Sequence, residues 1–157
     1  MIHPFQELMV LAQRYCRLIE GDCRDDPAWL AQVAEVLPRL HAALVSLGGG
    51  TDSATDLAAD LDARFELYMR LRDRLGERDG YWLEFDQVGE PAAMTGSLAD
   101  DLTDIYCELS QGLTLAEISP ERALEGLFGG FQIHWGRHLF DAQRHLAVLA
   151  AQGRLVS

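Results

Sequence analysis

Lysine is absent from this sequence: all thirteen basic residues of the 157-residue chain are arginines. A Schiff-base enzyme and a phosphate-binding loop each need a lysine side chain, so both classes are excluded. Clusters of basic residues are absent as well, and the formal net charge is −12. Because nucleic acids and anionic membrane surfaces bind clustered Lys and Arg, we expect neither as a partner.

Cysteines and long apolar runs are also scarce. The three cysteines, Cys16, Cys23 and Cys107, form no Cys-x-x-Cys pair, so we expect reduced thiols rather than disulfides or a thiolate zinc site. No stretch approaches the roughly twenty apolar residues of a membrane span. Residues 1–15 show neither the basic start nor the unbroken apolar run of a signal peptide. We therefore expect a cytoplasmic protein.

Motifs of covalent catalysis are missing too. The chain has no Gly-x-Ser-x-Gly turn, no cysteine with a histidine positioned beside it in sequence, and no glycine-rich loop after a strand. Nucleophilic and phosphate-loop chemistry therefore have no support in the sequence.

Apolar residues recur at helical spacing through most of the chain, which predicts an all-α bundle of about five helices in one domain, residues 1–157. Capping residues, first-turn prolines and stop glycines set the expected bounds, which are roughly 3–20, 26–48, 54–75, 97–112 and 119–151. The inward side of the third helix should comprise Leu57, Leu61, Phe65, Tyr68, Leu71 and Leu75.

Residues 76–96 lack a helical period and should form one long aromatic loop. A short strand is possible at 81–85, although no partner strand is visible. Two interpretations of the loop are open. Its aromatic side chains and Asp86 could form a lid over a pocket, or they could simply close one end of the bundle.

The fifth helix has an unusual composition, because it is apolar or small on every side. Gly126, Gly129, Gly130 and Gly136 fall on one side with Ile133 and Phe140, and larger apolar residues occupy the other side. Such a helix is normally buried on both sides, so it should be either the central helix or a homodimer helix. The alternative is a helix broken at Gly129 and Gly130.

Acidic residues collect on one flank of the fourth helix. Asp101, Asp104 and Glu108 share this flank, whereas Asp100 lies almost opposite the core and caps the helix. Neighbouring carboxylates repel one another unless cations or hydrogen bonds offset their charge. One explanation is that acids suit the positive end of the helix dipole. The other is an ion or a basic partner, since Glu108 lies beyond the reach of the dipole.

Histidines collect on one flank of the fifth helix. His134, His138, Asp141 and His145 share it, and histidines at i and i+4 have the spacing that two metal ligands need. Three interpretations stay open: a hydrogen-bonded structural network, a metal site, and an acid–base or switching role.

The link between the fourth and fifth helices is short, which predicts antiparallel neighbours. The two polar flanks should then meet, with Asp101 and Asp104 beside His134 and His138. A divalent metal held by these four residues is possible. A network of the same residues needs no cofactor.

Two segments resemble a known bacterial family. The runs SLADDLTDIY at 97–106 and HWGRH at 134–138, with Phe85-Asp86 and residues 12–20, are similar to the domain of unknown function 5063. The family usually has proline where this chain has Gln87. The resemblance implies an α-helical bacterial domain, and it implies no activity, ligand or functional residue.

Two functions follow from these patterns. The favoured hypothesis is a non-enzymatic helical domain that binds another protein or itself, because the fifth helix is two-sided and no catalytic set is complete. The alternative is a metal-dependent enzyme, such as a phosphate-ester hydrolase, that uses the acids and histidines between the fourth and fifth helices.

Overall fold

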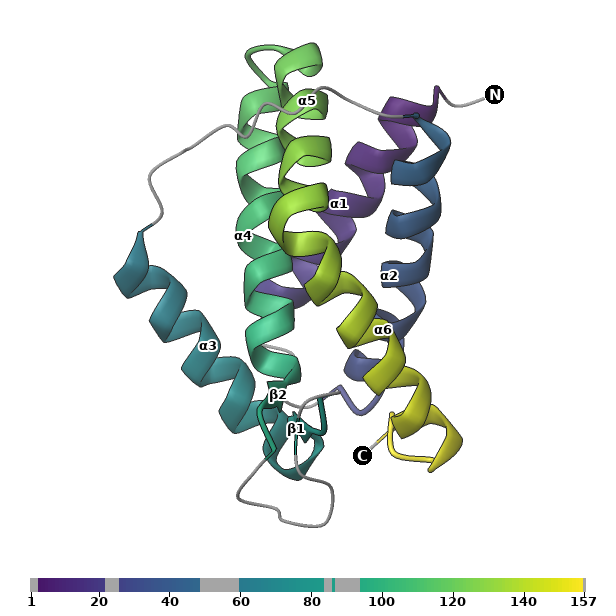
Figure 1. Cartoon of the computed structure of the whole chain (residues 1–157), viewed down its shortest axis with the longest axis vertical. Coiled ribbons are helices and arrows are strands. Elements are labelled where there is room, and N and C mark those ends of the chain that lie inside the picture. The colour runs from purple at the N-terminus through teal and green to yellow at the C-terminus, as the bar shows by residue number, and fades with distance from the viewer. Residues whose placement is uncertain (1–2, 22–25, 49–59, 84–85, 87–93, 157) are drawn as a thin grey trace.

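The first two helices form an adjacent pair in the computed structural model, which describes residues 3–21, 26–48, 60–83, 86 and 94–156 (Figure 1). Helix α1, Pro4–Glu20, begins where the His3 ring accepts a hydrogen bond from the Phe5 amide. Helix α2, Trp29–Ser46, follows a turn in which Asp26 accepts one from the Ala28 amide, and it continues through Pro38. Both expected helices are confirmed.

Helix α3, Leu61–Leu75, begins later than predicted, and only part of its predicted inward side, Tyr68, Leu71 and Leu75, packs on the core. Its first turn is capped by Asp60, whose side chain accepts hydrogen bonds from two backbone amides. The proposed start at 54 lies outside the described residues. The prediction that Leu61 and Phe65 face inward is wrong, because they are 72% and 61% exposed. The buried side of α3 consists of Leu67, Leu71 and Leu75.

A small β-ribbon follows α3. A 3-10 turn, Gly76–Arg78, leads into strand β1, Gly80–Tyr81, which pairs antiparallel with strand β2, Gly96–Ser97. The strand suspected at 81–85 is therefore shorter than expected, and it has a partner. A side chain at Gly96 would overlap the ring of Tyr81, so glycine is required at this close approach.

Helix α4, Leu98–Ala116, lies in the middle of the bundle and packs against α1, α3, α5 and α6. Ser97 caps it, as predicted, by accepting a hydrogen bond from the Asp100 amide. The predicted end at Gly112 is wrong. Gly112 is buried, and a side chain there would overlap Leu127 of the next helix, so this glycine permits close packing instead of stopping α4.

The predicted fifth helix is continuous, but it contains a π-helical turn. It consists of α5, Pro120–Gly130, the π turn Phe131–Trp135, and α6, Gly136–Ala151. The chain changes direction between α5 and α6 (Figure 1). A side chain at Gly136 would overlap the Phe131 carbonyl oxygen, so glycine is needed where the π turn ends. Turns of this kind occur often at functional sites.

The glycine-lined side of this helix is covered only in part, since Ile133 and Phe140 on the same side are 69% and 50% exposed. Gly129 and Gly136 are buried within the chain. A side chain at Gly130 would contact Glu108 and Trp135. The central helix is α4 and not this one, because α4 packs against α1, α3, α5 and α6. A homodimer through the fifth helix stays a prediction.

One hydrophobic core joins the helices, as expected for an all-α domain. Two buried hydrogen bonds hold it in register. Tyr15 of α1 donates to the Leu102 carbonyl over 2.7 Å, and the Trp135 indole donates to the Leu127 carbonyl over 3.1 Å. None of the described helices is both long enough and apolar enough to cross a membrane.

Candidate functional site

The polar flanks of α4 and α6 meet, as the short link predicts. His138 lies between two carboxylates of α4. Its Nδ1 is 2.7 Å from Asp101 Oδ1, and its Nε2 is 2.9 Å from Asp104 Oδ2. All three side chains are buried, each less than 10% exposed. The acidic residues that looked mutually repulsive in the sequence are thus bridged by one imidazole.

The two carboxylates favour a charged His138. Burial by itself would lower the pKa of His138, but the hydrogen bonds and charges of Asp101 and Asp104 raise it to about 9. An imidazolium has an N–H on both ring nitrogens, so it can donate to both partners at once. In the metal-free protein, His138 is therefore protonated at neutral pH.

We expect the stability of the metal-free protein to fall as pH rises from about 6.5 to about 9. The pKa of His138 is higher in the folded chain than its ordinary value of 6.5, so its stabilising contribution is complete below about 6.5 and is lost through about 9. Urea unfolding in the presence of a chelator should show a loss of roughly 1–3 kcal/mol across this window.

His138→Gln is the control for this pH series, because cysteines of the unfolded chain also titrate near the upper end. The difference between wild type and variant isolates the histidine. If the two proteins lose stability in parallel, His138 is not the group responsible.

Asp104 is shared between His138 and an arginine of α3. The Arg64 Nε donates to Asp104 Oδ1 over 2.9 Å, and its guanidinium also bonds Asp100 at 3.1 Å. Burial by itself would raise the pKa of Asp104, but the hydrogen bonds from His138 and Arg64 lower it. Arg64 was not predicted from the sequence, because no local pattern indicates that α3 packs beside the acidic flank of α4.

His134, from the π turn, extends the cluster toward solvent and is about half exposed. Its Nε2 lies 3.9 Å from Asp104 Oδ2, and its Nδ1 lies 3.5 Å from Glu108 Oε1. Burial raises the pKa of Glu108, although the neighbouring His134 opposes the shift. The predicted residues Asp104, Glu108, His134 and His138 therefore do come together.

Asp101 is held on its far side by Tyr81 of the β-ribbon, whose hydroxyl donates to Asp101 Oδ2. Burial raises the pKa of Asp101, and the hydrogen bonds from His138 and Tyr81 oppose this effect. Burial and the Asp101 charge raise the pKa of Tyr81 as well, so its hydroxyl stays protonated. The sequence placed Tyr81 in the loop but offered no signal for this contact.

The two remaining predicted residues lie apart from the cluster. His145 Nε2 is 2.7 Å from the Arg78 carbonyl, and its ring stacks on Tyr81. Burial lowers the pKa of His145 despite that hydrogen bond. Asp141 is half-buried and lines a cavity of about 460 Å³ next to His138. The structure thus does not bring either residue to Asp104.

Asp86 has a local structural role. Its carboxylate accepts hydrogen bonds from the Leu83 amide at 2.7 Å and from the Thr95 amide and hydroxyl at 3.0 and 2.6 Å. These bonds hold Leu83 and Thr95 together. The lid and the closure of one end of the bundle both stay predictions, and Phe85 lies outside the described residues.

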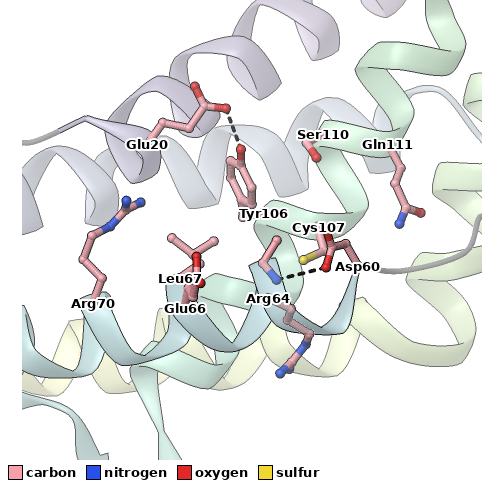
Figure 2. Close-up of a pocket in the computed structure, with 11 residues that line it drawn as sticks. Glu20, Asp60, Arg64, Glu66, Leu67, Arg70, Tyr106, Cys107, Ser110 and Gln111 are labelled. Atoms are coloured by element: carbon pink, nitrogen blue, oxygen red, sulfur yellow. Dashed lines mark hydrogen bonds between the residues drawn. The ribbon is translucent and has the colours of Figure 1, made fainter.

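A larger cavity of about 650 Å³ lies between α1, α3 and α4, and it contains none of the predicted site residues (Figure 2). Tyr106 donates to Glu20 Oε1 across it over 2.6 Å. Figure 2 shows that the Arg64 guanidinium points away from Tyr106. Cys107 lines the cavity, but burial raises the pKa of this thiol, which makes it a poor nucleophile.

Three potential ligand atoms converge at one point of the cluster. Asp104, His134 and His138 each offer one atom, and these atoms all lie within 4.8 Å of one another. The sequence suggested Asp101 as a fourth ligand, but the structure does not place it in this set. Asp101 instead contacts the opposite ring nitrogen of His138. It belongs to a second possible group, with Asp100 and His138.

Comparison with known proteins finds a matching family and a solved structure of similar fold. Residues 3–152 match the family described as "Domain of unknown function (DUF5063)". The crystal structure of protein BF1032 from Bacteroides fragilis is similar, with a TM-score of 0.73 and 18% identity, covering 91% of this chain and 89% of that one. That likeness shows a shared fold. No curated protein matches the chain.

Proposed function

The chain belongs to the family described as domain of unknown function 5063, and we propose that it is a helical domain that binds one divalent transition-metal ion. The ligands would be Asp104 Oδ2, His134 Nε2 and His138 Nε2. Histidine nitrogen together with carboxylate oxygen suits Zn²⁺ or Fe²⁺ better than Mg²⁺ or Ca²⁺, which prefer oxygen ligands. Three protein ligands leave a coordination position for water.

One observation carries this proposal: each of the three residues is held in place by its other polar atom. His138 Nδ1 bonds Asp101, and His134 Nδ1 faces Glu108. The second oxygen of Asp104 accepts from Arg64. A histidine that binds metal almost always donates its other N–H to a carboxylate or carbonyl, which fixes the ring and its tautomer. Both histidines here have a carboxylate in that position.

The charge of the cluster also supports a cation. With both imidazoles neutral, the carboxylates of Asp100, Asp101, Asp104 and Glu108 outnumber the single guanidinium of Arg64, and the cluster carries three excess negative charges. A divalent ion offsets two of them. Without the metal ion, the proton on His138 offsets part of this negative charge. Proton and metal ion therefore compete for His138 Nε2.

The geometry needs a small adjustment to hold an ion. Bonds of about 2.0–2.2 Å from nitrogen and oxygen to Zn²⁺ bring neighbouring ligand atoms to within roughly 3.5 Å of each other. The 2.9 Å between His138 Nε2 and Asp104 Oδ2 would open slightly, and the 3.9 Å to His134 Nε2 would close. His134 is half exposed, and its Nδ1 lies 3.5 Å from Glu108 Oε1, so a small rotation of the side chain can close the gap while that contact is kept.

Metal binding gives the alternative hypothesis from the sequence a physical basis. A homodimer through the fifth helix stays a prediction: Glu108 and Trp135 lie against Gly130, whereas Ile133 and Phe140 on the same side are exposed. Hydrolysis of a phosphate ester stays a prediction that rests on water in the open coordination position. A cytoplasmic location stays a prediction as well, supported by the free thiols of Cys16 and Cys107.

The proposal is tested by titrating Zn²⁺ into chelator-treated protein that carries no affinity tag. We expect one ion per chain. His134→Ala should weaken binding by more than about 100-fold, because a direct ligand contributes more than the 10–100-fold of an orienting residue. The same variant should change the free energy of unfolding by less than about 0.5 kcal/mol, since the side chain lies at the surface.

His3→Ala is the matched control, because His3 is an exposed histidine far from the cluster in sequence. It should bind Zn²⁺ as the wild type does. Substitution of Co²⁺ would add a spectroscopic check on coordination geometry. Equal affinities for wild type and His134→Ala would refute the metal site and leave a purely structural network.

A further inference from the structure

The outward side of α3 carries three large apolar residues in a row. Leu61, Phe65 and Met69 are spaced four residues apart, so they line one face of the helix over about 12 Å. They are 72%, 61% and 44% exposed. Single exposed apolar residues are ordinary on a protein surface, but three on one helix face form a continuous patch. We call this the α3 stripe.

The fold does not require the α3 stripe. The inner side of the same helix already supplies Leu67, Leu71 and Leu75 to the core. In Figure 1, α3 lies at the edge of the bundle, with its outer side turned away from α4. Within the described part of the chain, none of the other helices packs on that outer side. The helix therefore carries apolar residues on two different sides, and within the described residues only one of them packs against another helix.

Acidic residues border the α3 stripe along one edge. At about 100° per residue, Asp62, Glu66 and Asp73 fall together on the flank next to Met69. All three are exposed, and none of them forms an ion pair with another described residue. Arg72 bounds the stripe at its C-terminal end. The surface thus combines an apolar centre with one acidic edge.

We propose that the α3 stripe is the docking site for a basic amphipathic helix of another protein. Apolar residues at i, i+3 or i+4, and i+7 of that helix would cover Leu61, Phe65 and Met69, the usual way in which a helix binds an apolar surface. Lys or Arg along one side of it would face Asp62 and Glu66. Complementary charge would steer the encounter and set the orientation of the bound helix.

A second copy of this chain fits the same surface poorly. In an antiparallel pair of α3 helices, related by a two-fold axis, the acidic edge of one copy would lie against the acidic edge of the other. Like charges in that position oppose association. The net charge of −12 per chain adds a general repulsion between copies. A basic partner gains from both features.

Two synthetic helical peptides test the proposal, and neither test depends on the metal site. One peptide has a leucine stripe flanked by lysines, and the other has the same stripe flanked by glutamates. Fluorescence anisotropy should show that the lysine peptide binds wild type and the glutamate peptide does not. Phe65→Ala should weaken binding of the lysine peptide about tenfold or more, as expected for a central aromatic contact.

Three further variants separate docking from general attraction to an acidic protein. Val148→Ala, an exposed apolar position on α6, should leave affinity unchanged. Asp62→Asn combined with Glu66→Gln should weaken binding, and Glu121→Gln combined with Glu125→Gln on α5 should have much less effect. Equal loss in both acidic pairs, or no loss with Phe65→Ala, would overturn the proposal. So would a dimer in light scattering that Phe65→Ala converts to a monomer, since the occupant would then be a second copy.

Discussion

Asp104→Ala should abolish tight binding of Zn²⁺ at the proposed site. Asp104 Oδ2 is the atom on which both histidines converge, 2.9 Å from His138 Nε2 and 3.9 Å from His134 Nε2. Its loss removes the only carboxylate among the three ligands and leaves two neutral imidazoles. We expect affinity to fall by more than about 1000-fold, well beyond the 10–100-fold cost of losing an orienting residue. Calorimetric titration of Zn²⁺ measures the effect directly.

Glu108→Gln is the matched control for Asp104→Ala. Glu108 faces His134 Nδ1 and would only orient that ring, so its amide variant should bind Zn²⁺ about 10–100-fold more weakly and still saturate. Asp104→Ala should also cost about 1–3 kcal/mol of stability without metal, because Arg64 and His138 lose an acceptor. A variant that loses stability by this amount and yet keeps wild-type affinity would show that the cluster is structural only.

Asp101→Ala should produce the largest loss of stability in this region, about 3–5 kcal/mol in metal-free protein. Asp101 is only 3% exposed, and it accepts hydrogen bonds from the Tyr81 hydroxyl and from His138 Nδ1. Its removal leaves a buried hydroxyl and a buried imidazolium N–H without an acceptor. Chemical denaturation monitored by circular dichroism would measure the change.

Asp100→Ala is the control for that experiment, since it is the neighbouring aspartate on the same helix. Its side chain is 41% exposed and contacts Arg64 at 3.1 Å, so its removal should cost no more than about 1 kcal/mol. Comparable losses for the two variants would mean that the charge of the helix start, and not the buried network, provides the stability. In that case Asp101 would not be the partner that keeps His138 protonated.

Arg64 connects the helix of the proposed docking site with the helix of the proposed metal site. It extends from α3, whose outer side carries the α3 stripe, to Asp104 of α4, where the metal would bind. The same contact therefore helps to position a surface helix and one metal ligand. Substitution of Phe65 leaves this contact in place, whereas Asp104→Ala breaks it, so the two sets of variants test the proposals separately.

Local rules in the sequence were sufficient for the order of the helices, for their caps and for the contact between Asp104 and His138. Ser97 and Ser119 cap helices because a side-chain oxygen can accept a hydrogen bond from a free amide of the first turn, and this depends on no distant residue. Helical periodicity alone places Asp104 on the acidic flank of the fourth helix and His138 on the histidine flank of the fifth. A short link then requires the two helices to be neighbours, so the contact between Asp104 and His138 was predictable.

Tertiary structure decided which side of each helix is covered and which distant residues complete the site. Both sides of α3 are apolar in sequence, so periodicity could not tell that Leu71 would be buried and Phe65 exposed. Gly130 looked like a surface for a second chain, but it lies against Glu108 of α4. Arg64 and Tyr81 reach the aspartates from other elements of the chain. Local patterns give the direction of a side chain from its own helix, whereas a contact also depends on where the other elements pack.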